Sequence, residues 1–86
     1  MGIIESYEKY ELDEIIKHNI KNDLWIIINK KVYNITSFVK RHPGDEKMFI
    51  RHTGEDLNKS FKMFKREHNT KRVKLLMESL CIGILK

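Results

Sequence analysis

The residues best suited to chemistry in this chain are two histidines, His42 and His68, at the ends of a stretch rich in phenylalanine and methionine. The apolar side chains between them are Met48, Phe49, Leu57, Phe61, Met63 and Phe64. Imidazole nitrogen is a good ligand for iron, and the axial ligands of a haem approach the metal from opposite faces. This pattern predicts a haem site with His42 and His68 as its axial ligands.

The residues around His42 predict a sharp corner that presents its imidazole. Pro43 disfavours helical dihedrals at His42, so a preceding helix should end there. Gly44 accepts dihedrals that a residue with a Cβ resists, and we expect Asp45 to cap the helix that follows. The second histidine, His68, comes directly after another predicted helix.

Hydrophobic periodicity predicts helices on both sides of this corner. We expect helices at 12–17, 37–41, 45 to 51 or 52, 55–65 and around 73–80. In the first, Leu12, Ile15 and Ile16 would point inward. Thr36 would be the N-cap of the second, and Gly54 would end the third. In the last predicted helix, apolar residues recur at i, i+3, i+4 and i+7, namely Val73, Leu76, Met77 and Leu80. The four helices after residue 36 would form a cup with one histidine on each wall.

Strand signals lie at both ends of the chain and in its middle. We expect strands at 7–10, 24–28, 31–35 and 81–85. The second and third flank the turn residues Asn29 and Lys30, which predicts a central hairpin. Strands and helices mix without a βαβ repeat, so the predicted class is α+β. A length of 86 residues fits one domain, 1–86, in which Met1 to about Tyr7 would be a loose extension.

From about Tyr10 to Leu85 the chain resembles the cytochrome b5 domain family. The resemblance is carried by LDEIIKHN, LWIIINKKVYNITSFVKRHPGD, the second histidine with its polar neighbour, and the closing IGIL. A lone His-Pro-Gly is a weak motif, but its position after Trp25 and Phe38 is specific. The resemblance implies a cytochrome b5-like fold, in which a small mixed β-sheet and short helices form a four-helix haem-binding cup.

The resemblance also implies a cofactor and its contacts. The cofactor would be haem b, iron protoporphyrin IX held non-covalently. The residues expected to line its pocket are Ile28, Phe38, Met48, Phe49, Phe61, Phe64 and Leu76. Asn69 follows the second histidine where the family often has a serine, and its amide is expected to contact a propionate.

The function implied is one-electron transfer. Two axial histidines give a low-spin, six-coordinate iron, so the chain would relay electrons and would not be an enzyme by itself. The implied partners are a flavin- or NAD(P)H-dependent reductase and an acceptor oxidase, desaturase or hydroxylase, with the chain as a monomer. The alternative is a b5-like interaction or haem-binding module without an electron-transfer role.

The chain departs from the family pattern in three ways. Asp45 replaces a usual second glycine, and the spans after the two histidines are slightly longer, which shifts equivalences between Phe61 and Met77 by a position or two. The net charge is +5, whereas familiar members are acidic around the haem edge. The cations near the second ligand are Lys59, Lys62, Lys65, Arg66, Lys71, Arg72 and Lys74. They predict an acidic or neutral partner surface or attraction to anionic membrane, unless they simply form a solvated face.

Composition predicts a cytoplasmic protein, either a soluble form or the cytosolic domain of a truncated membrane-anchored protein. The single cysteine, Cys81, excludes an internal disulfide and is expected to be a small core residue. No apolar run approaches the length of a membrane span, although Gly2 fits a loose myristoylation pattern that would allow membrane contact.

Other functions are less well supported by the residues. Positive charge alone suggests nucleic acid, but no recognition helix or interleaved stacking aromatics accompany it, so no nucleic-acid partner is expected. Zinc is disfavoured because the histidines and Cys81 lack paired ligand spacing. His52 competes as second axial ligand but lies on the same wall as His42. His18, in the last turn of the first predicted helix, is expected to be structural.

Overall fold

The computed structural model describes the backbone of residues 7–67 and 70–86 and the side chains of residues 7–62 and 71–86. Its strands are β1 (Glu8–Tyr10), β2 (Asn19–Ile20), β3 (Asp23–Ile28), β4 (Lys31–Asn34) and β5 (Cys81–Leu85). Its helices are α1 (Leu12–Ile15), α2 (Thr36–Arg41), α3 (Glu46–Arg51), α4 (Asn58–Glu67) and α5 (Thr70–Leu80). The expectations for the N-terminal extension and for Gly2 fall outside the described residues.

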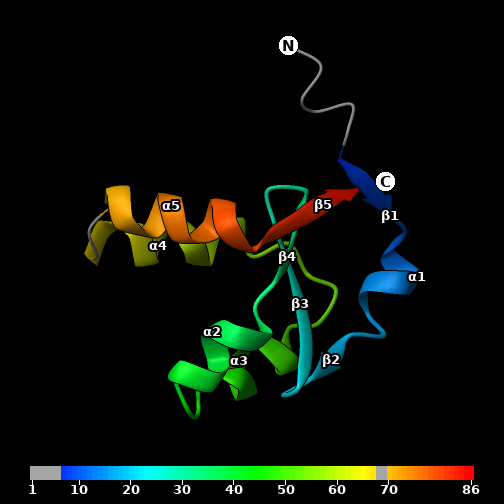
Figure 1. Ribbon diagram of the computed structural model, residues 1–86, viewed down its shortest axis with the longest axis horizontal. Helices are drawn as coiled ribbons and strands as arrows, with labels where there is room; N and C mark the ends of the chain where they lie inside the picture. The colour runs from blue at the N-terminus through cyan, green and yellow to red at the C-terminus, as the bar shows by residue number, and fades with distance from the viewer. Residues whose placement is uncertain (1–6, 68–69) are drawn as a thin grey trace.

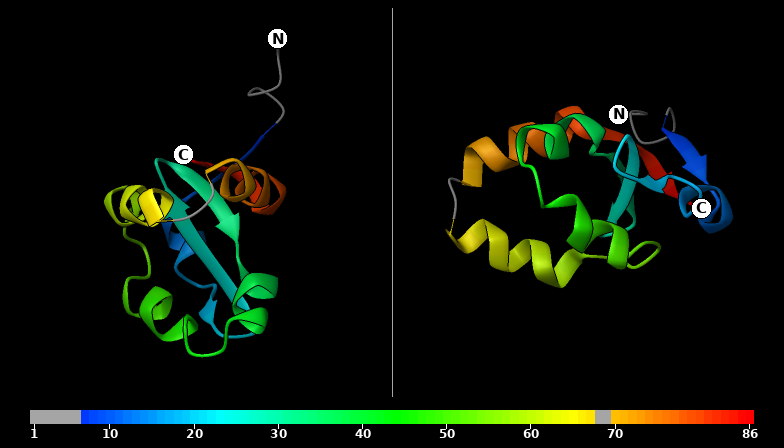
Figure 2. Two further views of the ribbon diagram at one scale, coloured as in Figure 1. Left: turned by 90° about the vertical axis from the view of Figure 1, so that its left-hand side faces the viewer. Right: turned by 90° about the horizontal axis from the view of Figure 1, so that it is seen from below.

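The described strands form one sheet in the order β1-β5-β4-β3-β2. Strand β1 runs parallel to β5, and the other neighbouring pairs are antiparallel. The pair α4 and α5 and the pair α2 and α3 lie on one side of the sheet, and α1 lies on the opposite side (Figure 1). Viewed toward the helices, the two pairs stand apart with the sheet behind them (Figure 2). The predicted α+β class is confirmed.

The central hairpin forms as predicted. Asn29 and Lys30 have φ of 51° and 66°, and strand pairing closes directly beside them with Ile28 opposite Lys31. Two consecutive positive φ angles are typical of the two-residue turn whose twist matches that of paired strands. The hairpin therefore gives the sheet its two middle strands, β3 and β4, and β5 returns beside β4 over the predicted range.

Alternation along β3 divides the core between the two faces of the sheet. One buried cluster contains Leu24, Ile26 and Ile28, and Cys81 packs against it. The other cluster, which includes Ile27, lies with Ile15 of α1. Because the side-chain period of a strand is two, one apolar run supplies both faces. The helix-side cluster forms the base on which α2–α5 pack.

The first helix is shorter than predicted, and its expected inward residues were partly wrong. Helix α1 spans only Leu12–Ile15, so it makes a single turn. Ile15 is fully buried, but Leu12 and Ile16 are 45% and 40% exposed. One turn presents about one side chain per face to the sheet, so the neighbours of Ile15 point away from it. The short edge strand β2 was not predicted, because two residues carry no periodic signal.

Two predicted helix caps were also wrong. Thr36 lies inside α2, and its hydroxyl accepts a hydrogen bond from the Leu24 N–H at 3.0 Å and donates to the Asn34 side chain at 2.7 Å. Its side chain is therefore used to tie α2 to β3. Asp45 makes no side-chain cap bond to α3. At the start of α2 the Asn34 side chain accepts the Thr36 N–H at 3.1 Å in place of the predicted cap.

Helix α4 begins at Asn58, three positions after the predicted start at residue 55, because Asp56 is engaged with the hairpin. Its carboxylate accepts hydrogen bonds from the backbone N–H groups of Asn29 at 2.8 Å, Lys30 at 3.0 Å and Asn58 at 3.0 Å. The neighbouring Leu57 N–H donates to the Ile27 carbonyl at 2.8 Å. Asp56 thus fixes the α3–α4 connection to the β3–β4 turn.

We expect Asp56→Ala to lower the free energy of unfolding by about 2 kcal/mol, since three N–H groups lose a charged acceptor. Burial by itself raises the pKa of Asp56, but the three N–H bonds outweigh it and hold the pKa below its usual value of 3.8. The contribution is therefore present above pH 3.8 and is lost as pH falls through the lower folded-state pKa. Urea unfolding as a function of pH measures it. Asp45→Ala, at an exposed carboxylate without a cap bond, is the matched control and should change stability little.

His18 joins α1 to the β2–β3 hairpin, beyond the end of the helix in which it was predicted. Its Nδ1 lies 2.8 Å from Asp23, and its Nε2 lies 2.9 Å from Glu14. Its ring stacks on Trp25 with centroids 3.6 Å apart and planes inclined by 6°. With a carboxylate at each ring nitrogen, both nitrogens are placed to donate, which favours the imidazolium form. His18 therefore has a structural role.

The stability supplied by His18 should depend on pH. Burial lowers the pKa of His18, but the hydrogen bonds to Glu14 and Asp23 outweigh it and raise the pKa above 6.5. A raised folded-state pKa stabilises the fold fully below pH 6.5, and this contribution is lost as pH rises through the folded-state pKa. We expect His18→Gln to be less stable than the parent at acidic pH and closer to it at alkaline pH, as measured by urea midpoints. An equal difference at both pH values would contradict the charged pairing.

Candidate functional site

An apolar cavity of about 130 Å³ lies between the sheet and helices α2–α5. Its lining residues are Ile26, Ile28, Ile35, Phe38, Met48, Phe49, Leu57, Ser60, Phe61, Val73, Leu76, Met77 and Leu80. Only Ser60 among them is polar. Every buried side-chain nitrogen or oxygen of the described residues has a hydrogen-bond partner, so the cavity wall contains no unsatisfied buried polar group there.

Six of the predicted pocket residues line this cavity: Ile28, Phe38, Met48, Phe49, Phe61 and Leu76. The side chain of the seventh, Phe64, falls outside the described residues. Several lining residues were not predicted for the pocket, and some had a visible signal. Ile26 shares the face of Ile28 on β3, and Val73, Met77 and Leu80 belong to the periodic stripe of α5.

His42 lies at the rim of the cavity, at the corner between α2 and α3. The predicted corner is present: His42 ends α2 with φ of −130° and ψ of 71°, and Gly44 has φ of 99°. The imidazole is exposed and stacks on Phe38, with ring centroids 4.5 Å apart and planes inclined by 28°. Because Phe38 lines the cavity, this contact places the His42 ring beside a wall residue, although His42 is not itself among the lining residues.

A buried carboxylate, Glu46, stabilises the same corner and was not predicted. It is 8% exposed, and its Oε1 accepts a hydrogen bond from the Gly44 N–H at 3.0 Å. The His42 carbonyl accepts a second bond from the Asp45 N–H at 3.1 Å. These two bonds close the turn on both sides of Gly44. Glu46 is therefore the residue that positions the backbone presenting His42.

The other described histidines are not at this cavity. His52 forms a hydrogen bond to Glu55 at 3.2 Å and lines an adjoining surface hollow, which shares Met48, Leu57 and Ser60 with the cavity. His18 is held on the far side of the sheet. No cluster of metal-binding side chains is found within the described part of the chain.

His68 and Asn69 lie outside the described residues. In the sequence they fall between the end of α4 at Glu67 and the start of α5 at Thr70. Both of these helices contribute lining residues to the cavity, from Phe61 on α4 to Leu76 on α5.

The side chains that line the cavity are chemically suited to the body of a haem. A porphyrin is a flat apolar ring whose burial is favourable by about 25 cal/mol per Å² removed from water. The cavity offers apolar and aromatic walls on both helix pairs, and an imidazole stands at its rim. Such a concave apolar site with few polar groups is typical of a cofactor pocket.

Residues 11–86 match the family described as Cytochrome b5-like Heme/Steroid binding domain. This chain belongs to that family. Membership of the cytochrome b5-like family implies haem b as the cofactor. It also supports a role as a haem-binding electron carrier. None of the helices in the described residues is long and apolar enough to cross a membrane.

Known relatives of this cytochrome b5-like domain are similar over most of its length. A cytochrome b5 of Rhizopus stolonifer is 46% identical over 52 residues, which is 60% of this chain and 40% of that protein. An acyl-lipid (8-3)-desaturase B of Dictyostelium discoideum is 47% identical over 60 residues, which is 70% of this chain and 13% of the desaturase. The chain thus spans about half or less of the length of these relatives.

Solved structures confirm the cytochrome b5 fold. The cytochrome b5 of Ostreococcus tauri virus 2 has a TM-score of 0.67 and 36% identity, covering 88% of this chain and 94% of that one. Cytochrome b558 of Ectothiorhodospira vacuolata, described as a prokaryotic homologue of cytochrome b5, has a TM-score of 0.71 and 26% identity. It covers 93% of this chain and 100% of its own.

Proposed function

We propose that this domain is a one-electron carrier that holds haem b between His42 and His68 as axial ligands. The observation that carries the proposal is the stacking of His42 on Phe38 at the rim of a cavity lined almost wholly by apolar side chains. Haem iron supplies a one-electron couple when bound. The remaining pocket assignments, Phe64 for the wall and Asn69 for a propionate, belong to the same proposal.

Each described residue has a part in this proposal. Phe38 orients the His42 ring, and Glu46 holds the turn that carries it. The apolar walls exclude water, which strengthens metal–ligand bonding and tunes the potential. With histidines on both sides no coordination position stays open, so catalysis at the metal is disfavoured and electrons would pass through the exposed edge.

The partners we propose are a flavin- or NAD(P)H-dependent reductase as donor and an oxidase, desaturase or hydroxylase as acceptor. The similar segment in a Dictyostelium desaturase supports a desaturase acceptor. We place the chain in the cytosol as a monomer, with residues 1–86 as one domain, and not as an enzyme by itself. The family match from residue 11 onward is consistent with this division.

Haem titration of the purified chain tests the proposal. We expect a Soret band to saturate at one haem per chain, with low-spin spectra in both the oxidised and the dithionite-reduced forms. Bands characteristic of an open sixth position would contradict two histidine ligands. A chain that folds but takes up no haem would favour the alternative, a b5-like interaction module.

A further inference from the structure

The net positive charge of this protein arises in the part of the chain that surrounds the cavity. Residues 36–80 contain eleven lysines and arginines and six acidic residues, whereas the rest of the chain contains six of each. The whole net charge of +5 therefore resides in the segment that includes α2–α5. Such an asymmetry produces a directed surface potential that a neutral distribution would not.

Three acidic residues of this segment are held by bonds within the chain, and none of them pairs with a lysine or arginine among the described residues. Glu46 is buried and accepts the Gly44 N–H. Asp56 accepts three backbone N–H groups, and Glu55 pairs with His52. These carboxylates face turns and helix ends of their own chain, so they are poorly placed to neutralise the lysines.

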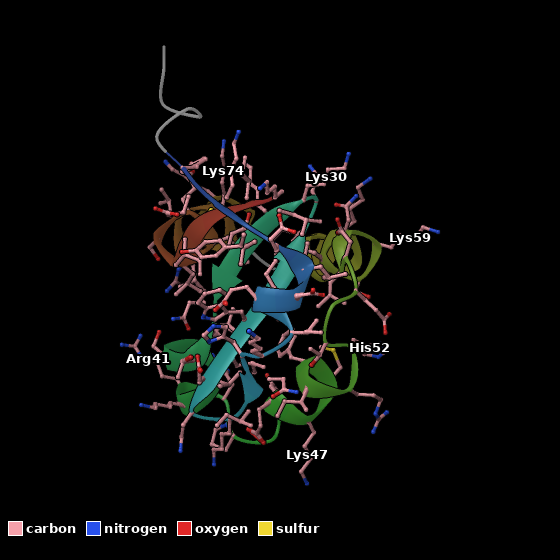
Figure 3. All side chains as sticks on the ribbon, turned by 90° about the vertical axis from the view of Figure 1, so that its right-hand side faces the viewer. Lys30, Arg41, Lys47, His52, Lys59 and Lys74 are labelled. Carbon is pink, nitrogen blue, oxygen red and sulfur yellow. The ribbon has the colours of Figure 1, made fainter. Side chains whose placement is uncertain are left out.

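The cations of the same segment are exposed and come from all four helices. Those at exposed positions include Lys40, Arg41, Lys47, Lys59, Lys62, Lys71 and Lys74. Within residues 7–62 and 71–86, none of these seven forms an ion pair. Arg41, Lys47, Lys59 and Lys74 point outward at separate places around the outline of the molecule (Figure 3). We define these seven residues as the cationic rim.

We propose that the cationic rim is the docking surface for a redox partner with an acidic face, a statement that rests on the function proposed above. Arg41 directly precedes His42, and α2–α5 are the helices that line the cavity. A protein that approaches the cofactor edge must therefore approach these cations. Complementary charge accelerates such an encounter and selects the orientation in which the two redox centres come close.

An acidic protein fits the cationic rim better than an anionic membrane does. Interfacial membrane binding relies on aromatic and leucine side chains beside the cations. In the described part of α2–α4 the phenylalanines, Phe38, Phe49 and Phe61, line the cavity and are only partly exposed. Among the described side chains, exposed leucines lie beside the cations on α5 alone, where Leu75 and Leu76 are 59% and 39% exposed after Lys74. The rim also draws on four helices, whereas a basic amphipathic helix places its cations along one face.

The test uses haem-loaded protein and a plant-type [2Fe–2S] ferredoxin, an acidic one-electron donor, as the probe. One electron passes from reduced ferredoxin to the ferric haem, and its rate is followed at the Soret band by stopped flow. We expect the second-order rate constant to fall steeply with ionic strength. The double variants Lys40→Gln/Arg41→Gln and Lys71→Gln/Lys74→Gln should each lower it about three- to tenfold at an ionic strength of about 0.1 M.

A matched control removes the same charge elsewhere. Lys9→Gln/Lys17→Gln alters exposed lysines of β1 and the α1 end. At the same ionic strength of about 0.1 M, where charges beyond about 10 Å are screened, it should leave the rate within about twofold. A rate that does not depend on salt, or that falls equally in the control, would overturn the docking surface. So would rim-dependent binding to phosphatidylserine vesicles accompanied by no salt effect on the ferredoxin reaction.

The spectrum recorded before the kinetics separates the two proposals. If no low-spin haem protein forms, the proposed function fails first. If it forms and the kinetic pattern is absent, only the docking surface fails.

Discussion

Replacing His42 by alanine is expected to eliminate the low-spin haem spectrum of this protein. The imidazole is exposed at a corner closed by the Gly44–Glu46 bond, so its removal should leave the fold intact. Surface substitutions of this kind change stability by about 0.5 kcal/mol or less. Loss of the spectrum would then report lost ligation and not lost structure.

Replacing His68 by alanine should have the same spectroscopic effect if the two histidines act as a pair. Each single variant leaves one imidazole, so the iron would become five-coordinate or take water, with a high-spin spectrum. Haem affinity should fall by at least tenfold, which titration against the parent protein measures. An axial bond contributes well over the 1.4 kcal/mol that corresponds to a factor of ten.

His52→Ala is the matched control for both variants. His52 is also a histidine of the helical segment, but it pairs with Glu55 and lines another surface hollow. We expect its spectrum and haem affinity to be those of the parent. If His52→Ala lost the low-spin bands and His68→Ala kept them, the second ligand would be His52 and the assignment to opposite walls would be wrong.

Replacing Gly83 by alanine is expected to destabilise the fold by about 3 kcal/mol, since overpacking at a rigid site typically costs 1–3 kcal/mol and sometimes more. Gly83 is opposite Glu8 in the parallel β1–β5 pairing and is buried. A Cβ there would come within 2.4 Å of the Glu8 carbonyl oxygen and 2.8 Å of the Tyr10 ring. The first of these contacts is with backbone, so only a shift of β1 can relieve it.

Gly44→Ala is the control that separates crowding from backbone strain. Gly44 has φ of 99°, which disfavours a Cβ, but no atom lies within 4 Å of the position a Cβ would take. We therefore expect it to cost about 1 kcal/mol. Urea unfolding of the two variants measures the difference. If Gly83→Ala proved no less stable than Gly44→Ala, β1 would have to be free to move away from β5.

Local features of the fold could be predicted from the sequence because they depend on neighbouring residues. The hairpin follows from the continuous apolar run of β3 and the turn at Asn29 and Lys30, and the corner follows from Pro43 and Gly44. The stripe of α5 follows from its period. Backbone sterics and periodicity act within a few residues, so they leave a readable pattern.

The apolar character of the site could also be predicted from the sequence, because its large apolar side chains must be buried. Phe38, Phe61 and Leu76 line the cavity as expected from their positions on helix faces and from the family resemblance. The ligand roles of His42 and His68 remain predictions. The local pattern could not show which carboxylates would accept backbone N–H groups of the folded chain. The structural roles of Glu46 and Asp56 were therefore not predicted.

The sequence by itself determined the order of the elements other than β2, the hairpin, the His-Pro-Gly corner and the family, since these depend on local spacing. Tertiary structure decided the rest. It engaged Thr36 with β3, drew Asp56 to the β3–β4 turn, buried Glu46 under the corner and left Leu12 and Ile16 exposed. Each of these outcomes depends on which backbone N–H groups and surfaces come together from different parts of the chain. Their consequence is a cavity surrounded by helices whose cations face outward.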